Sequence, residues 1–268
     1  MRALVLVVLL LPPVGPGPIV APVREGERPV PARAPAPAPQ REKDPDSLYA
    51  DREHLPSAID AAALWESRMS SDARDFEAAW KLARACYWLG GHVPADERRR
   101  QYERGIDAAK RAVAVRPDRP EGHFWMAANM GAMAESFGLR AGLRYKGPVK
   151  TELETVLSTD PSYLLGSADR ALGRWYFRVP RLFGGSKDRS VEHLRRSLTY
   201  APDSTASHYF LAETLLDMDR REEARSELQK VIDAPLDPDW APEDREFKQK
   251  ALTLLKKVAA ATAAEGRS

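Results

Sequence analysis

Residues 202–235, PDSTASHYFLAETLLDMDRREEARSELQKVIDAP, contain the pattern that decides the fold. Apolar and small side chains recur there at helical spacing in two successive segments, with a proline at either end. The small side chains of Ala212 and Ala224 would let two antiparallel helices approach closely, while leucines fill the seam between them. The stretch therefore predicts a helix pair. Its packing positions are Leu211, Ala212, Leu215, Ala224, Leu228 and Val231.

Earlier parts of the chain carry degenerate versions of this unit. Segments that close one helix before the next recur at residues 114–118, 158–162 and 200–204. Their prolines are spaced more widely than the roughly 34-residue period of tetratricopeptide (TPR) repeats, so we expect insertions within the repeats. Glycine and proline favour longer turns as the place for them. The three segments with such residues are 90–100, 138–147 and 178–187.

The C-terminal segment predicts a helix that covers the last repeat. Its apolar residues at helical spacing are Phe247, Ala251, Leu254, Leu255 and Val258. Terminal repeats need such a cap because they otherwise expose one apolar face. No run of alternating β-branched residues suggests a sheet. The expected fold is all-α: a solenoid of antiparallel helix pairs built from divergent TPR-like repeats, with a C-terminal capping helix.

The sequence divides into three parts. In residues 1–21, Arg2 precedes an apolar run from Ala3 to Leu11, which has the length of a secretory signal and is shorter than a membrane span. Residues 22–47 are rich in proline and alanine and predict a disordered linker, and residues 48–268 form the repeat domain. We expect an exported protein, periplasmic or secreted, without a cysteine-linked lipid anchor. Whether the signal is cleaved or serves as an anchor is left open.

Composition excludes several classes of function. Lysine and arginine total 41 against 39 acidic residues, so the net field does not point to a nucleic-acid or membrane-surface partner, and any basic patch must be local. A single cysteine rules out an internal disulfide framework. The five histidines lack metal-ligand spacing, and no catalytic motif occurs. We therefore expect a non-enzymatic protein with no metal, no cofactor and no integral membrane span.

Two segments resemble known divergent repeat families: residues 121–131, EGHFWMAANMG, and residues 173–185, GRWYFRVPRLFGG. The tryptophan-bearing helices and the Pro-x-x-x-Gly-Gly turn resemble the T-component of bacterial tripartite (TRAP) transporters. The Gly-His-x-Trp segment is similar to the regulator of microtubule dynamics family. The predicted export signal favours the first. That resemblance implies an oligomeric, periplasmic helical scaffold that binds a small hydrophobic ligand or a solute-binding partner protein.

Eight residues are candidates for a binding site on the first helices of neighbouring repeats. They are His123, Trp125, Asn129, Arg170, Arg174, Trp175, Tyr176 and Arg178. The aromatic members could frame an apolar pocket on the concave face, or they could fill the core. The arginines share one helix face and could hold a carboxylate ligand or acidic peptide, or they could form a solvated face paired with acids.

Three functions remain open at this stage. The leading hypothesis is an extracytoplasmic helical-repeat binding protein of the transporter-component type. The alternative is a generic TPR scaffold that docks a protein partner and has no ligand pocket, and a third is an enzyme of unrecognised type. A homo-oligomer is compatible with each. Fold alone does not decide among them, because repeat folds host many roles.

Overall fold

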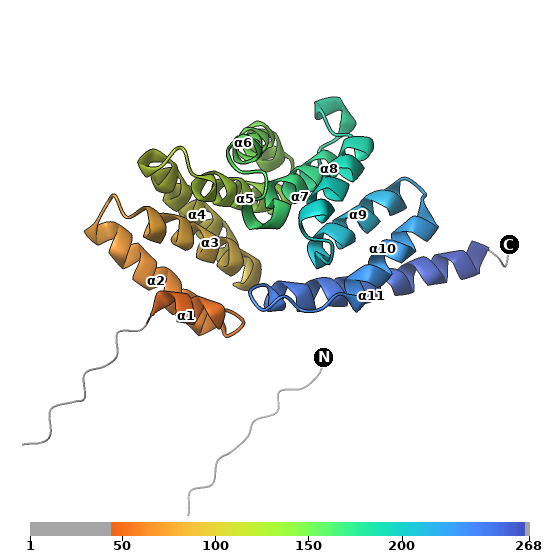
Figure 1. The fold of residues 1–268 in the computed structure, drawn as a ribbon, viewed down its shortest axis with the longest axis horizontal. Helices are drawn as coiled ribbons and strands as arrows, with labels where there is room; N and C mark the ends of the chain where they lie inside the picture. The colour runs from red at the N-terminus through yellow and green to blue at the C-terminus, as the bar shows by residue number, and fades with distance from the viewer. Residues whose placement is uncertain (1–43, 266–268) are drawn as a thin grey trace, which may run out of the picture. The chain divides into compact units, whose positions relative to one another are not determined.

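The computed structural model describes residues 44–265, with side chains to residue 259 (Figure 1). The described residues form eleven α-helices and one short 3-10 helix, with no strand. The helices are α1 (Pro45–Ala50), α2 (Leu55–Ser71), α3 (Phe76–His92), α4 (Ala95–Val115), α5 (Pro120–Ser136), α6 (Gly138–Thr159), α7 (Tyr163–Arg178), η1 (Arg181–Phe183), α8 (Lys187–Tyr200), α9 (Thr205–Asp217), α10 (Arg221–Asp233) and α11 (Ala241–Glu265). The all-α solenoid is confirmed.

Four helix pairs follow one another along the solenoid: α3 with α4, α5 with α6, α7 with α8, and α9 with α10 (Figure 1). The last pair is the unit predicted from residues 202–235, and all six of its packing positions are buried. Pro117, Pro161 and Pro202 each lie in the turn between one pair and the next. The predicted repeat boundaries are therefore confirmed.

Only one of the three expected insertions lengthens a turn. Residues 179–186 connect α7 to α8 through η1, but most of residues 90–100 and all of residues 138–147 are helical. The expectation was wrong for these two segments because glycine weakens a helix without breaking it, and because Pro94 lies at the N-cap of α4 and not inside a helix. The extra residues instead extend α6 to 22 residues.

Close helix crossings depend on glycine at two buried positions. A Cβ atom at Gly173 would lie 2.5 Å from Cγ of Leu194, where α7 crosses α8. A Cβ atom at Gly105 would lie 2.3 Å from Oδ1 of Asn129, where α4 crosses α5. Each pair can approach this closely only because the side chain is missing.

Helix α11 caps the last repeat as expected. Ala251 belongs to the apolar cluster of α9 and α10, and Phe247, Leu254 and Leu255 pack against that cluster. Among the residues described, no helix combines the length and apolarity needed to cross a membrane. The predicted apolar run at residues 3–11 and nearly all of the predicted linker lie outside the described residues, although α1 already begins at Pro45.

The first half of α11 also reaches the opposite end of the solenoid. The Arg52 guanidinium donates to both carboxylate oxygens of Glu243, at 3.1 and 2.5 Å, and to the carbonyl of Asp239 at 2.8 Å. Nearby, Arg245 pairs with Glu53, and His92 bonds to Glu246 at 2.7 Å. We call this set of three pairs the closure contact, because it joins the beginning of the helical unit to its last helix.

Replacing Gly173 by alanine should destabilise the fold by about 1–2 kcal/mol, since overpacking against Leu194 outweighs the gain in helix propensity. Gly131→Ala is the matched control, because a Cβ atom there meets nothing within 4 Å. It should stabilise α5 by up to about 1 kcal/mol. Urea unfolding midpoints measure both, and equal shifts for the two variants would contradict the crossing.

Replacing Glu243 by glutamine should cost about 2 kcal/mol, because the Arg52 side chain is 5% exposed and loses its charged acceptor. Glu53→Gln removes the acidic partner of Arg245 from a pair that is about half exposed. That control should cost less than about 1 kcal/mol. Chemical denaturation of the two variants compares the costs, and a larger effect at Glu53 would show that Arg52 does not hold the ends together.

The His92 pair should make the closure contact stronger in mild acid. Burial opposes the charged imidazole, but hydrogen bonds to Glu246 and to the Trp88 carbonyl raise the pKa of His92 above its ordinary value. A raised folded-state pKa gives stability that is fully present below the unfolded pKa of 6.5 and is lost as pH rises through the folded-state pKa. The pKa of Glu246 is lowered, chiefly by the hydrogen bond to His92, so this carboxylate stays charged there.

The melting-temperature difference between the natural protein and His92→Gln should therefore be larger at about pH 6 than at about pH 8. Scanning fluorimetry in both buffers provides the measurement. A difference that does not change with pH would mean that the imidazolium makes no contribution.

Candidate functional site: an apolar cavity on the concave face

A cavity of about 1230 Å³ lies on the concave side of the solenoid. Its wall consists mainly of α5, α6 and α7, with α9 beside them, and α3 contributes Tyr87. Helices α3, α5, α7 and α9 are the first helices of the four pairs. Residues 235–240 and the first half of α11 contribute the opposite side. Figure 1 shows α11 running across the open side of the arc of helices. The closure contact thus turns a groove into a partly enclosed cavity.

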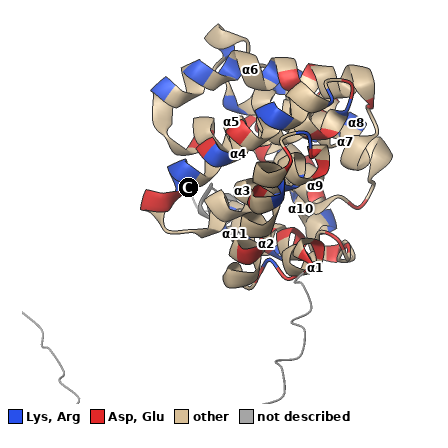
Figure 2. Cartoon of the chain, turned by 90° about the vertical axis from the view of Figure 1, so that its left-hand side faces the viewer, with Lys and Arg blue, Asp and Glu red and all other residues tan. Residues whose placement is uncertain are grey.

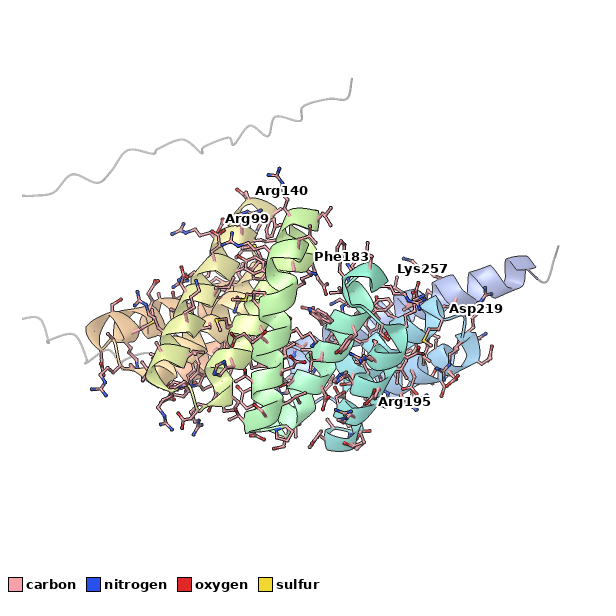
Figure 3. All side chains as sticks on the ribbon, turned by 90° about the horizontal axis from the view of Figure 1, so that it is seen from above. Arg99, Arg140, Phe183, Arg195, Asp219 and Lys257 are labelled. Atoms are coloured by element: carbon pink, nitrogen blue, oxygen red, sulfur yellow. The ribbon has the colours of Figure 1, made fainter. Side chains whose placement is uncertain are left out.

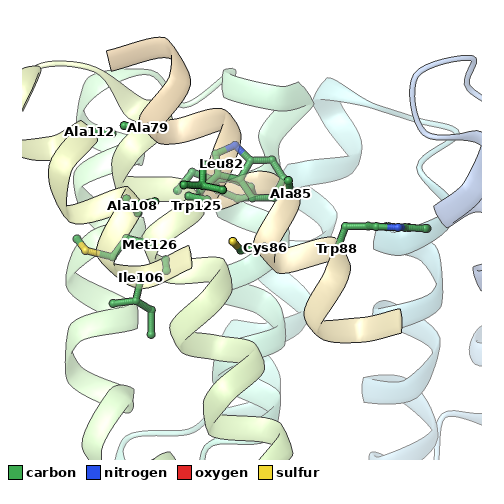
Figure 4. Packing of buried hydrophobic residues seen from close by; sticks show 14 of the residues in the cluster. Ala79, Leu82, Ala85, Cys86, Trp88, Ile106, Ala108, Ala112, Trp125 and Met126 are labelled. Carbon is green, nitrogen blue, oxygen red and sulfur yellow. The ribbon is translucent and has the colours of Figure 1, made fainter. Parts of the chain in front are cut away.

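The sequence of α5 explains why space remains there. Bulky side chains would fill the concave face, but α5 presents a series of small residues to the cavity, namely Ala127, Ala128, Gly131, Ala132 and Ala134. On its other side, α5 packs against α3 and α4, and Met126 belongs to the same apolar cluster as Ala108 and Ile106 (Figure 4). The helix is therefore held in place while its concave face stays open.

Aromatic side chains supply much of the remaining wall. Trp125 is 3% exposed, and its ring centroid lies 5.8 Å from that of Tyr87 and 5.1 Å from that of Phe124. The indole of Trp175 donates to the Lys146 carbonyl at 2.8 Å, which fixes it against α6. The wall is rigid, apolar and suited to hydrophobic contact.

The three arginines of the predicted stripe differ in their partners. Arg174 bonds to Glu135 at 3.1 Å and to Glu213 at 2.5 Å, and Arg178 lies 3.8 Å from Glu135. These two match the interpretation of a face paired with acids. Arg170 also lines the cavity, but in the described part of the chain no acidic side chain lies within salt-bridge distance of it.

The environment of Arg170 makes it a candidate anion site in the cavity. Desolvation lowers the pKa of its guanidinium, with Tyr87 and Asp244 opposing this shift. Arginine nevertheless remains charged at neutral pH, because its ordinary pKa lies above about 12. A charge enclosed without a partner is costly, and an anionic ligand would relieve that cost. Arg170 can therefore donate two parallel hydrogen bonds to a carboxylate.

Three predicted site residues do not reach the cavity. His123 bonds to Glu152 at 2.5 Å and to the Pro117 carbonyl at 3.1 Å, which ties α5 to α6 and to the preceding turn. The buried amide of Asn129 donates to the carbonyls of Ala83 and Trp125. Tyr176 stacks on His193, because a position next to Trp175 lies about 100° around the helix and faces α8. These residues hold helices together. The cavity brings together Trp125, Arg170, Arg174, Trp175 and Arg178.

Sequence reasoning missed part of the wall at the start of α7. Leu164 and Leu165 line the cavity with φ of 45° and 56°, and Gly166 follows with φ of 72°. Leucine rarely adopts this left-handed conformation, so no pattern pointed to it. Gly166 was the one available signal.

Metal and nucleophilic chemistry find no support in the described residues. Residues 44–265 contain no group of three or more histidine, cysteine or acidic side chains placed to hold a metal ion. Cys86 is buried, and burial raises the pKa of its thiol to about 12, so the reactive thiolate is not formed near neutral pH. The arrangement favours binding through shape and charge.

Comparison with solved structures supports the repeat fold. TTC0263, a TPR protein from Thermus thermophilus, is similar at 22% identity over 79% of this chain and 97% of its own, with a TM-score of 0.60. MamA from Desulfovibrio magneticus RS-1 is 16% identical over 72% of this chain and 96% of its own, with a TM-score of 0.48. No curated protein matches the chain by sequence.

A family match decides between the two resemblances. The sequence pattern described as "Regulator of microtubule dynamics protein 1-3" matches residues 43–183, whereas the transporter T-component is not confirmed. The match runs from α1 to η1 and so includes Trp125, Arg170 and Trp175. Because it covers more than half of the 268 residues, this chain belongs to the regulator of microtubule dynamics protein 1-3 family.

Proposed function

We propose that this chain is a non-enzymatic, TPR-like scaffold that binds an apolar segment of a partner protein in the concave cavity, with a carboxylate of that segment on Arg170. The observation that carries the proposal is the guanidinium of Arg170, which lines the same cavity as the aromatic side chains and has no acidic side chain within salt-bridge distance in the described residues. The carboxylate can be the carboxyl terminus of the partner or an acidic side chain. In either case the charge of Arg170 fixes the position of the bound segment along the cavity, and the aromatic wall supplies the contact area.

The shape of the site suits an extended segment. The first helices of successive pairs form one continuous surface, as in other TPR-like solenoids, and peptides dock along such surfaces. Two serine side chains in the cavity wall, Ser136 and Ser204, can bond to a peptide backbone. The acidic side chains Glu135 and Glu213 are occupied by Arg174, so they would not repel an incoming carboxylate strongly.

A second candidate is a small hydrophobic carboxylate, and the partial enclosure of the cavity favours it. Small-molecule sites usually occupy about 300–1000 Å³, and this cavity is somewhat larger than that range. An apolar chain would contact Trp125 and Trp175, with its carboxylate on Arg170. This candidate keeps the ligand class that the sequence suggested without requiring a transporter.

The location of the protein is a separate proposal that rests on sequence alone. The apolar run at residues 3–11 supports export, and a transporter role has only the resemblance stated above in its favour. No contact between copies of the chain supports self-association. Binding through Arg170 does not depend on any of these points.

Replacing Arg170 by methionine should weaken carboxylate binding by about tenfold or more, since a hydrogen bond to a charged group contributes about 1.5–3 kcal/mol. Fluorescence anisotropy with a pooled library of apolar peptides, prepared with free and with amidated carboxyl termini, tests the first candidate. Calorimetry with dodecanoate and dodecanol tests the second. The natural protein should bind the free-carboxyl peptides more tightly than the amidated ones, and dodecanoate more tightly than dodecanol. The Arg170→Met variant should bind the two peptide forms with equal affinity, and likewise the two small molecules.

The same substitution should stabilise the empty protein by about 1 kcal/mol, because it removes an enclosed charge without a partner. Arg178→Met is the control, since its half-exposed guanidinium lies near Glu135 and should affect neither quantity strongly. If Arg170→Met lowers stability and leaves acid preference unchanged, Arg170 serves packing and the proposed function fails.

A further inference from the structure

Basic residues gather in two stretches of the chain that contain no acid. Residues 136–151 carry four basic side chains and residues 170–187 carry five, although the whole chain is nearly balanced at 41 basic against 39 acidic residues. The two stretches meet in space, because Trp175 bonds to the Lys146 carbonyl and the Lys146 ammonium lies 4.8 Å from the ring centroid of Phe183. A balanced sequence therefore folds into a locally cationic surface.

Several of these cations have no acidic partner. Arg174, Arg178, Lys150 and Lys187 lie within salt-bridge distance of carboxylates. Within residues 44–265, no such pair involves Arg140, Arg144, Lys146 or Arg181. Figure 2 shows blue segments along α6, the helix that carries Arg140, Arg144 and Lys146. The unpaired charges point to an anionic partner from outside the chain.

Large apolar side chains are exposed among the same cations. Leu182 is 87% exposed and Leu139 is 72% exposed, the highest values among the exposed large hydrophobic residues of the described chain. Leu143 and Phe183 are exposed to a lesser degree. Arg140 and Phe183 project from the same side of the molecule in Figure 3. We call Leu139, Arg140, Leu143, Arg144, Arg181 and Leu182 the basic-apolar surface.

The backbone holds both parts of this surface away from the core. Pro148 removes one hydrogen bond inside α6, and the buried residues of this helix, Val149, Leu153 and Val156, all lie after it. The turn after η1 needs Gly184, with φ of 102°, and Gly185, where a Cβ atom would lie 1.7 Å from the Val179 carbonyl oxygen. This tight turn leaves Arg181 and Leu182 projecting into solvent.

We propose that the basic-apolar surface docks onto an anionic lipid bilayer. Arginine and lysine near an anionic membrane each contribute about 1 kcal/mol, and exposed leucines can enter the boundary between headgroups and acyl chains. An acidic protein would match the charges but would leave Leu139 and Leu182 in water. The net charge of the chain is only +2, so attraction is confined to this face and orients the molecule.

Docking would place one edge of the cavity at the membrane. Leu139 and Leu143 of the basic-apolar surface, together with Phe183, also belong to the cavity wall. The proposal does not rest on the occupant of the cavity, because the unpaired cations and exposed leucines are independent of Arg170. Failure of one proposal therefore leaves the other standing.

Co-sedimentation of the full chain with vesicles tests the inference. One set consists of phosphatidylcholine alone, and in the other about a third of the lipid is phosphatidylglycerol. We expect more binding to the anionic set. The double variant Arg140→Glu with Arg144→Glu should reduce the extra binding to anionic vesicles by about tenfold or more.

The double variant Leu139→Ser with Leu182→Ser should weaken vesicle binding several-fold. The charge-matched control is Lys256→Glu with Lys257→Glu, two exposed positions on α11, and it should change vesicle binding little.

A second measurement, in which docking produces a signal instead of a loss of binding, distinguishes failure to dock from failure to fold. An environment-sensitive dye on Leu182→Cys should shift to the blue when anionic vesicles are added, and Cys86 is buried and does not compete for the label. No anionic preference, or one that survives the Arg140 and Arg144 reversals, would overturn the proposal. A second result would also overturn it: the dye spectrum stays unchanged, soluble polyglutamate binds the protein, and the leucine variants bind polyglutamate as well as the natural protein does. That result would identify a site for an acidic protein.

Discussion

The buried ion pair between Arg52 and Glu243 is the contact on which the cavity depends. Arg52 is held from three sides: its carbonyl accepts the indole N–H of Trp88, and its guanidinium lies over the rings of Tyr49 and Trp88. Residues of α1 and α3 thus position a cation that, in the described part of the chain, pairs with a carboxylate of α11. Without this pair, α11 would be held to the start of the helical unit by the more exposed Arg245–Glu53 and His92–Glu246 pairs, and the concave side would open more easily. Solvent would then reach Arg170, and water would weaken the electrostatic attraction between its guanidinium and an anionic ligand.

Local periodicity predicted the helix pairs and the cap, because those contacts join residues close in sequence. It could not predict the closure contact, whose partners Arg52 and Glu243 are 191 residues apart. The arginine stripe shows the same limit within the site. Helical spacing placed Arg170 and Arg174 on one face, but the acids that neutralise Arg174 come from two other helices, each 39 residues away. The presence or absence of such a partner separates a structural arginine from a binding one.

Features that cost stability collect around the cavity and its edge. Arg170 is a charge without a partner, Leu164 and Leu165 adopt left-handed backbone angles, and Leu182 exposes an apolar side chain. Each costs on the order of 1 kcal/mol, and folding alone supplies no reason to keep any of them. The helix pairs elsewhere, such as α9 with α10, follow the packing rules closely. Exceptions that cluster in one region are typical of a functional site.

The closure contact and the basic-apolar surface lie on different parts of the solenoid. In Figure 1, α6 stands on the far side of the arc from α11. A protein held at a membrane by α6 and η1 would therefore keep the closure contact in solvent, free to respond to pH through His92. The cavity lies between the two, with walls from both α6 and α11. If both proposals hold, membrane docking would set where the cavity is presented, and the closure contact would set how far it is closed.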